Sequence, residues 1–227
     1  MDEVIATPRI ALLAGATGLI GRALLPLLLA SKQYRSVHVL LRRAAPDIEA
    51  NTKLYIHEVD FARLPTDFPR VDDAFIALGT TIKVAGSEAA FRQVDFDFVV
   101  NTARAARAAG ATRLAVVSAL GADAKSRVFY NRVKGEMQAA IAQLGYESVV
   151  IAQPSLLLGD RAALRQPARS GEMLAARLLG PLAWIVPKGV RPIQASAVAS
   201  ALLAAIVNAK PGIRVLKSGD MQADDPS

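Results

Sequence analysis

A chain of 227 residues, 52% of them apolar, can bury a substantial core, so its composition excludes general disorder and indicates one domain or at most two. The absence of cysteine excludes disulfides, thiolate metal sites and a cysteine nucleophile, and with only two histidines, His38 and His57, we expect no metal site. The net charge of +7 is not concentrated in a lysine-rich run with interleaved aromatic residues, so we expect no nucleic-acid partner.

From the sequence pattern we expect neither a secretory signal nor a membrane span. Residues 1–5 lack the basic and apolar regions of a signal peptide. The longest apolar stretches, residues 23–30 and 178–187, are far shorter than the roughly 20 residues that cross a bilayer. We therefore expect a cytoplasmic protein.

The first predicted strand, residues 10–14, runs through a glycine-rich turn into a helix over residues 19–30. Gly15 can adopt the positive φ of a tight turn, Gly18 lets a ligand approach the backbone, and Gly21 lets the helix pack closely on the strand. The N–H groups that open such a helix favour a pyrophosphate. This segment predicts a dinucleotide-binding turn made by Gly15, Thr17, Gly18, Leu19, Ile20 and Gly21.

The second predicted strand, residues 37–41, ends in Arg42 and Arg43. In NAD-binding folds of this kind an acidic residue here binds the free ribose hydroxyls, whereas guanidinium groups suit a 2′-phosphate. We therefore expect NADP(H) to be preferred over NAD(H), the alternative being an ordinary basic loop. The third strand, residues 54–59, is followed by Asp60, which we expect to face the adenine.

The fourth predicted strand, residues 73–78, ends in a small polar turn. Ligands of open α/β sheets bind at the carboxyl ends of the strands, so Leu78, Gly79 and Thr80 are expected to contact the cofactor. A long helix is predicted over residues 87–109, with Ser87 as its N-cap and Gly110 as its stop.

The fifth predicted strand, residues 113–117, is followed by Ser118, and a helix to residue 144 contains Tyr130 and Lys134. Residues four apart share one helical face, so the phenol and the ammonium can point into the same crevice. A strand-end serine upstream of this pair strengthens the indication of a proton-transfer site.

The sixth predicted strand, residues 149–152, is followed by Pro154, which we expect beside the cofactor. Residues 156–192 hold six basic and two acidic residues and are predicted to form a small lobe covering the substrate. Their arginines either bind an anionic group of the substrate or form ordinary solvated surface. A helix over residues 195–209 and a strand over residues 213–217 complete a single domain, 1–219, followed by a frayed tail, 220–227.

Alternating strands and helices predict an α/β fold. Five segments, Leu-Leu-Ala-Gly-Ala-Thr-Gly-Leu-Ile-Gly, Leu-Gly-Thr-Thr, Val-Asp-Phe-Asp, Ser-Ala-Leu-Gly-Ala-Asp and Tyr-Asn-Arg-Val-Lys-Gly-Glu, resemble atypical short-chain dehydrogenases/reductases. Within that superfamily the chain is similar to the Tat-interacting-protein group of NADPH-binding proteins and its bacterial relatives, over nearly its whole length. One departure is Asp95, which stands where extended members carry asparagine.

The resemblance implies a Rossmann-like, doubly wound, mostly parallel sheet with helices on both faces. It also implies NADP(H) binding and a catalytic set of Ser118, Tyr130 and Lys134. In this set Tyr130 exchanges the proton with a substrate oxygen, Ser118 polarises that oxygen, and Lys134 holds the ribose hydroxyls of the nicotinamide end.

Two functions remain open from the sequence. The first is an NADP(H)-dependent reductase or dehydrogenase, a monomer or homodimer, acting on a carbonyl or secondary alcohol of a small molecule. The alternative is an NADP(H)-binding regulator without a physiological substrate.

Overall fold

The computed structural model describes residues 8–65, 68–158 and 189–222. Its centre is a seven-stranded sheet in which every pair of neighbouring strands is parallel. The order is β3-β2-β1-β4-β5-β6-β9, with β1 Arg9–Ala14, β2 Tyr34–Leu41, β3 Leu54–Glu58, β4 Asp73–Ile76, β5 Arg113–Val117, β6 Ser148–Gln153 and β9 Gly212–Lys217. The strand order reverses between β1 and β4, which confirms the predicted doubly wound, Rossmann-like sheet and places a ligand crevice at that point.

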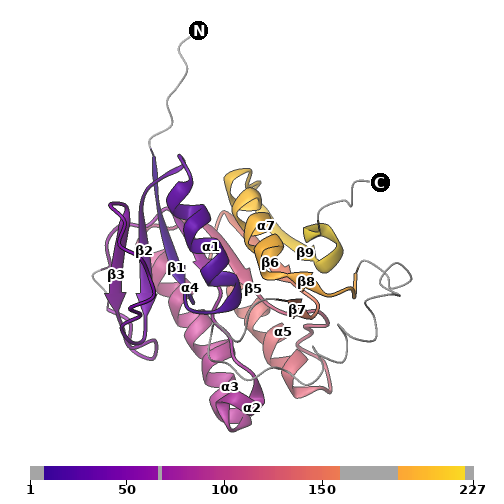
Figure 1. Ribbon diagram of the computed structural model, residues 1–227. Helices are drawn as coiled ribbons and strands as arrows, with labels where there is room; N and C mark the ends of the chain where they lie inside the picture. The colour runs from indigo at the N-terminus through magenta and orange to yellow at the C-terminus, as the bar shows by residue number, and fades with distance from the viewer. Residues whose placement is uncertain (1–7, 66–67, 159–188, 223–227) are drawn as a thin grey trace.

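Helices cover both faces of this sheet (Figure 1). On one face lie α1 (Leu19–Ala30) and α7 (Ala195–Val207), which pack against each other. On the other lie α4 (Val99–Ala108) and α5 (Phe129–Ala142). Because successive strand residues point to opposite faces, the five inner strands, from β2 to β6 in the sheet order, contribute to two separate apolar cores.

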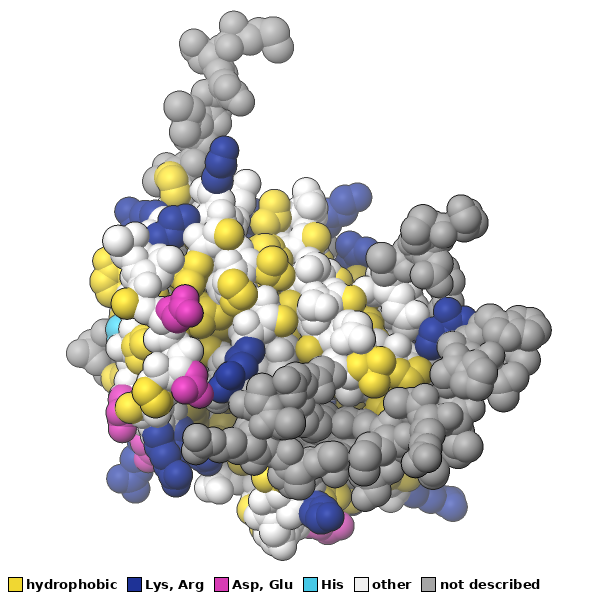
Figure 2. All heavy atoms as spheres, in the orientation of Figure 1, with side chains coloured by type: hydrophobic (Ala, Val, Ile, Leu, Met, Phe, Trp, Pro, Cys, Tyr) yellow, Lys and Arg dark blue, Asp and Glu magenta, His cyan; other side chains and the backbone are white. Residues whose placement is uncertain are grey.

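The layer of α1 and α7 is held by apolar packing. Helix α7 carries no charged residue, and Arg22 is the only one on α1. Figure 2 shows the outward surface over these helices, where apolar side chains (yellow) and other side chains and backbone (white) predominate over charged side chains. Nonpolar contact, with little contribution from charge, therefore joins the first and last helices of the fold.

The long helix predicted over residues 87–109 is present but irregular. A short helix, α2 (Ile82–Ala85), precedes it, and α3 (Glu88–Arg92) begins at the predicted cap, where Ser87 Oγ accepts the N–H of Ala90 at 3.1 Å. A π-helical segment, η1 (Gln93–Phe98), then joins α3 to α4. The wider turn belongs to the stretch that carries Asp95, whose side chain is buried.

The predicted frayed tail is wrong at its start. Residues Ser218–Met221 form a short 3₁₀ helix, η2, in which Asp220 accepts the N–H of Lys217 at 2.9 Å. Met221 is only 4% exposed because it packs into the core beneath α1 and α7. Burial of one apolar side chain thus orders a stretch whose polar composition suggested fraying.

The predicted substrate-covering lobe falls mainly outside the described residues. Of residues 156–192, the structure describes 156–158 and 189–192. Next to the main sheet a two-stranded parallel sheet joins β7 (Leu157–Leu158) to β8 (Ile193–Gln194). The two ends of this segment therefore meet beside the last strands of the domain.

A buried carboxylate at the start of β4 makes folding stability depend on pH. Asp73 is 1% exposed, lies 2.5 Å from the Arg9 guanidinium and accepts the hydroxyl of Tyr34 at 3.0 Å. Burial raises the pKa of Asp73 from 3.8 to about 6, against the attraction of Arg9. The folded protein therefore keeps a proton that the unfolded chain releases, and stability is lost as pH rises between these two values.

We expect the stability of the wild type relative to Asp73→Asn to fall by about 3 kcal/mol between about pH 3.5 and 7, because a shift of about two pKa units corresponds to that energy. Urea unfolding of both proteins at several pH values measures it. The amide does not titrate, so a constant offset from Arg9 is expected in addition. A difference that is the same at every pH would contradict the prediction.

Candidate cofactor and active site

The glycine-rich turn after β1 is built by close backbone packing. Gly15 has φ of +94°, and a Cβ added to it would lie 2.5 Å from the backbone of Ala77. A Cβ added to Gly21 would lie 2.0 Å from the carbonyl oxygen of Gly15. No side chain caps the start of α1 and no acidic residue lies in its first turn, so its N–H donors remain available to an anion.

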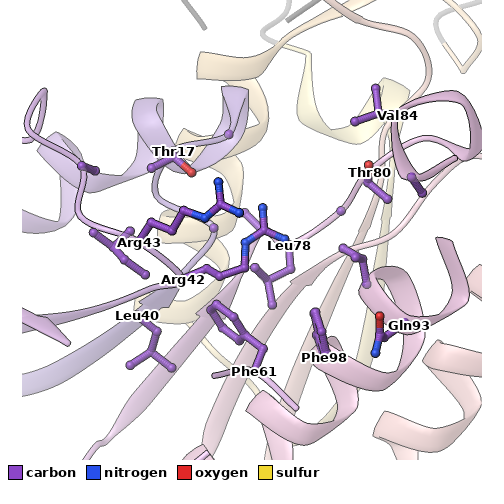
Figure 3. Close-up of a pocket in the computed structure, with 18 of the residues that line it drawn as sticks. Thr17, Leu40, Arg42, Arg43, Phe61, Leu78, Thr80, Val84, Gln93 and Phe98 are labelled. Carbon is purple, nitrogen blue, oxygen red and sulfur yellow. The ribbon is translucent and has the colours of Figure 1, made fainter. Parts of the chain in front are cut away.

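A pocket of about 630 Å³ lies at the carboxyl ends of the central strands, beside this turn (Figure 3). Eight of the predicted cofactor residues line it: Gly15, Thr17, Gly18, Arg42, Arg43, Leu78, Gly79 and Thr80. Sequence reasoning missed its apolar lining by Leu40, Phe61, Val84, Val94 and Phe98, and also Gln93. These side chains come from the end of β2, the turn after β3, α2 and η1, so only the fold brings them together.

Arg42 and Arg43 lie at the end of β2, and both are exposed. In Figure 3 their guanidinium groups are directed into the pocket. The described residues lining the pocket include no carboxylate. Neither arginine forms an ion pair within the ranges that the structure describes, so both charges are available to a bound anion.

The remaining predicted cofactor residues do not line this pocket. Leu19, Ile20 and Gly21 form the first turn of α1, where Ile20 and Gly21 are buried and support the glycine turn.

Asp60 is exposed, and its carboxylate accepts the N–H of Ala62 at 2.9 Å, so it shapes the turn after β3 while the neighbouring Phe61 lines the pocket. Pro154 is buried at the end of β6, where its carbonyl accepts the N–H of Leu120 at 3.0 Å.

Ser118, Tyr130 and Lys134 also lie outside the pocket lining. Tyr130 is half-buried, with its ring centroid 5.3 Å from that of Phe91. Ser118 is 4% exposed, and its Oγ accepts a hydrogen bond of 2.5 Å from Gln138 Nε2. Tyr130 and Lys134 follow one another at a spacing of four along α5, and Gln138 extends the same row.

Gln138 is a site residue that the sequence did not single out. Gln153 Nε2 donates to Gln138 Oε1 at 3.2 Å, so Gln153 orients the amide that bonds to the serine at the end of β5. The spacing of four from Lys134 was an available signal, but nothing in the sequence connects it to Ser118. The Gln138 amide donates to the serine oxygen, so the hydroxyl hydrogen of Ser118 is free to point toward another acceptor.

Lys134 lies close to Gly79, in the turn that follows β4 and lines the pocket. It is 3% exposed, and its Nζ lies 2.8 Å from Oδ1 of Asp95. The other oxygen of Asp95 accepts the N–H of Thr80 at 2.8 Å. A Cβ added to Gly79, which lines the pocket, would lie 3.3 Å from Asp95 Oδ1 and 3.8 Å from Lys134 Nζ. Because glycine has no side chain, the ion pair lies directly beside the pocket at this turn.

A family model described as NAD(P)H-binding matches residues 15–156, which span the glycine turn, the pocket and the Tyr130–Lys134 pair. The chain belongs to this NAD(P)H-binding family. The predicted relation to atypical short-chain dehydrogenases and to the Tat-interacting-protein group is confirmed by the relatives of this NAD(P)H-binding protein.

Two relatives show the extent of that similarity. Protein HTATIP2 of Rattus norvegicus is 34% identical over 172 residues, which are 74% of this chain and 69% of the relative. Protein FMP52, mitochondrial, of Eremothecium gossypii is 36% identical over 152 residues, 66% of this chain and 67% of the relative.

Solved structures share the fold of this NAD(P)H-binding protein at low identity. MoeE5 in complex with UDP-glucose and NAD has a TM-score of 0.67 at 18% identity, covering 91% of this chain and 74% of that one. UDP-glucose 4-epimerase of Thermotoga maritima with UDP-glucose has a TM-score of 0.69 at 14% identity, covering 92% and 77%. Within the described ranges, no helix has the length and apolarity to cross a bilayer.

Proposed function

We propose that this protein is an NADP(H)-dependent oxidoreductase that reduces a carbonyl, or oxidises a secondary alcohol, of a small molecule. The observation that carries the proposal is the pocket itself. It is lined by two arginines, by the glycine turn that opens an uncapped helix, and by the turn after β4, whose Gly79 lies close to Lys134.

The pocket fits a phosphorylated dinucleotide. Gly18 leaves room for a close approach, since a Cβ there would meet only Gly15 O at 3.4 Å and Ala77 O at 3.9 Å. The N–H groups of α1 suit the pyrophosphate, and Arg42 and Arg43 suit the 2′-phosphate of NADP(H) better than the free hydroxyls of NAD(H). The ring of Phe61, which lines the pocket, offers a surface for the adenine.

Residues on and beside α5 supply the groups that transfer the proton, bind the substrate oxygen and hold the cofactor ribose. Bound NADP(H) provides or accepts the hydride. Tyr130 gives its hydroxyl proton to the substrate oxygen in reduction and takes it back in oxidation. The Ser118 hydroxyl, whose oxygen is held by Gln138, donates a hydrogen bond to the same oxygen. Lys134 holds the ribose hydroxyls of the nicotinamide end.

A titration with NADPH, followed by a screen of carbonyl compounds for loss of NADPH absorbance, tests this function. We expect saturable NADPH binding and consumption of NADPH with at least one carbonyl class. The panel includes pairs of carbonyl compounds that differ only in carrying a carboxylic acid or the matching amide, because the sequence left open that the arginines of residues 156–192 bind an anionic group of the substrate. Absence of NADPH binding would overturn the proposal.

The second candidate is an NADP(H)-binding regulator, and one observation favours it. Ser118, Tyr130 and Lys134 do not line the described pocket, and Lys134 is engaged by Asp95. Tight NADPH binding, with no turnover of any carbonyl or alcohol offered, would support the regulator over the enzyme.

Cellular location stays a prediction. We expected the cytoplasm, whereas FMP52 of Eremothecium gossypii and its counterpart in Emericella nidulans are named mitochondrial. Fractionation of the source cells with an antibody to the protein decides between the cytoplasmic and organellar fractions.

A further inference from the structure

Two buried charges lie immediately beside the pocket. The side chains of Lys134 and Asp95 are 4% and 1% exposed, and their Nζ and Oδ1 atoms are 2.8 Å apart. A buried ammonium without a partner is strongly unfavourable, so the carboxylate is what makes this position of the lysine tolerable. The residues are 39 positions apart, and only the packing of η1 against α5 brings them together.

The carboxylate of Asp95 does more than neutralise the lysine. Its second oxygen accepts the N–H of Thr80, in the turn that follows β4. Thr80 and Gly79 both line the pocket, whereas Asp95 itself does not. The Asp95 side chain therefore links helix α5, which carries the lysine, to a turn that lines the pocket.

We propose that Asp95 is a positioning residue that holds the Lys134 ammonium and the Gly79–Thr80 turn in the geometry that binds the nicotinamide half of the cofactor. This inference rests on the function proposed above and names the residue on which one half of its cofactor site depends. Asp95 acts through Lys134 and Thr80 and needs no contact with the ligand. The adenosine half, beside Arg42 and Arg43, does not depend on Asp95.

The experiment compares two ligands that differ in the nicotinamide half. NADPH has both halves, whereas adenosine 2′,5′-bisphosphate has the adenosine and 2′-phosphate but no nicotinamide ribose. In Asp95→Asn we expect the Kd of NADPH to rise roughly tenfold or more, since bonds to charged groups are involved. The Kd of adenosine 2′,5′-bisphosphate is expected to change less than about twofold. The amide oxygen can still accept from Thr80, so the variant removes the charge and keeps an acceptor for the turn.

Asp97→Asn is the matched control. Asp97 lies two residues further along the same π-helical segment and is exposed. Its substitution by asparagine removes the same charge as Asp95→Asn. We expect it to leave both Kd values unchanged. If both aspartate variants weakened NADPH equally, general charge and not the Lys134 contact would be responsible, and the proposal would be overturned.

Lys134→Met and the double variant Asp95→Asn/Lys134→Met cover the case in which the single aspartate variant folds poorly. Both should lose affinity for NADPH but not for adenosine 2′,5′-bisphosphate. The double variant should bind NADPH no more weakly than Lys134→Met alone, because the two residues act as one unit. A merely structural role of Asp95 predicts equal losses for both ligands, and that result would overturn the proposal. If the wild type itself binds adenosine 2′,5′-bisphosphate and NADPH poorly, the proposed function fails instead.

Discussion

Replacing both Arg42 and Arg43 with alanine is expected to weaken NADPH binding by about 2 to 4 kcal/mol and to leave NADH binding nearly unchanged. Both guanidinium groups are directed into the pocket, and neither forms an ion pair within the described ranges. The two cofactors differ only in the 2′-phosphate, so a loss confined to NADPH locates that phosphate at the arginines. Calorimetric titration of both cofactors measures the difference.

Arg35→Ala is the control for this experiment. Arg35 is exposed near the opposite end of the same strand, β2, and does not line the pocket. We expect it to leave both affinities unchanged. Added salt should weaken NADPH binding to the wild type more than to the double variant, because exposed charges are screened. Equal losses of NADPH and NADH in the double variant would contradict the assignment of a 2′-phosphate site.

Tyr130→Phe is expected to lower turnover of a verified substrate by about 10² to 10⁴ while changing cofactor affinity little. The substitution removes the hydroxyl that exchanges the proton and keeps the ring that packs on Phe91. Steady-state turnover and NADPH titration of the same preparation separate the two effects.

The control for Tyr130→Phe is Tyr55→Phe, which removes a phenol hydroxyl from the edge strand β3, where Tyr55 is 51% exposed. Turnover should be the same as in the wild type. Full activity of Tyr130→Phe would show that the proton comes from another group, and would contradict the role proposed for Tyr130.

Local sequence patterns predicted the strands and the glycine turn because the apolar run of a buried strand and the spacing of glycines in a turn are each set within a few residues. The apolar run before Gly15 reads as a buried strand, and the glycine spacing reports a backbone contact that a Cβ would block. Arg42 and Arg43 follow the carboxyl end of one strand, where ligands of such sheets bind, so the sequence predicted two basic residues in the pocket. Asp60 was assigned to the pocket by analogy, but its carboxylate bonds to the backbone two residues on, a local alternative that aspartate often takes in turns.

The sequence by itself determined the parallel sheet, the glycine turn, the arginine pair and the shared helical face of Tyr130 and Lys134. Only the tertiary structure decided what that face meets. The spacing of four places a lysine on a side of α5, but the partner of its ammonium comes from η1, far away in the chain. Ser118 likewise meets Gln138, which Gln153 holds in turn, only where strand ends and a helix pack together. The physical reason is that periodicity specifies the direction of a side chain from its own backbone, whereas burial of a charge depends on neighbours that the fold supplies.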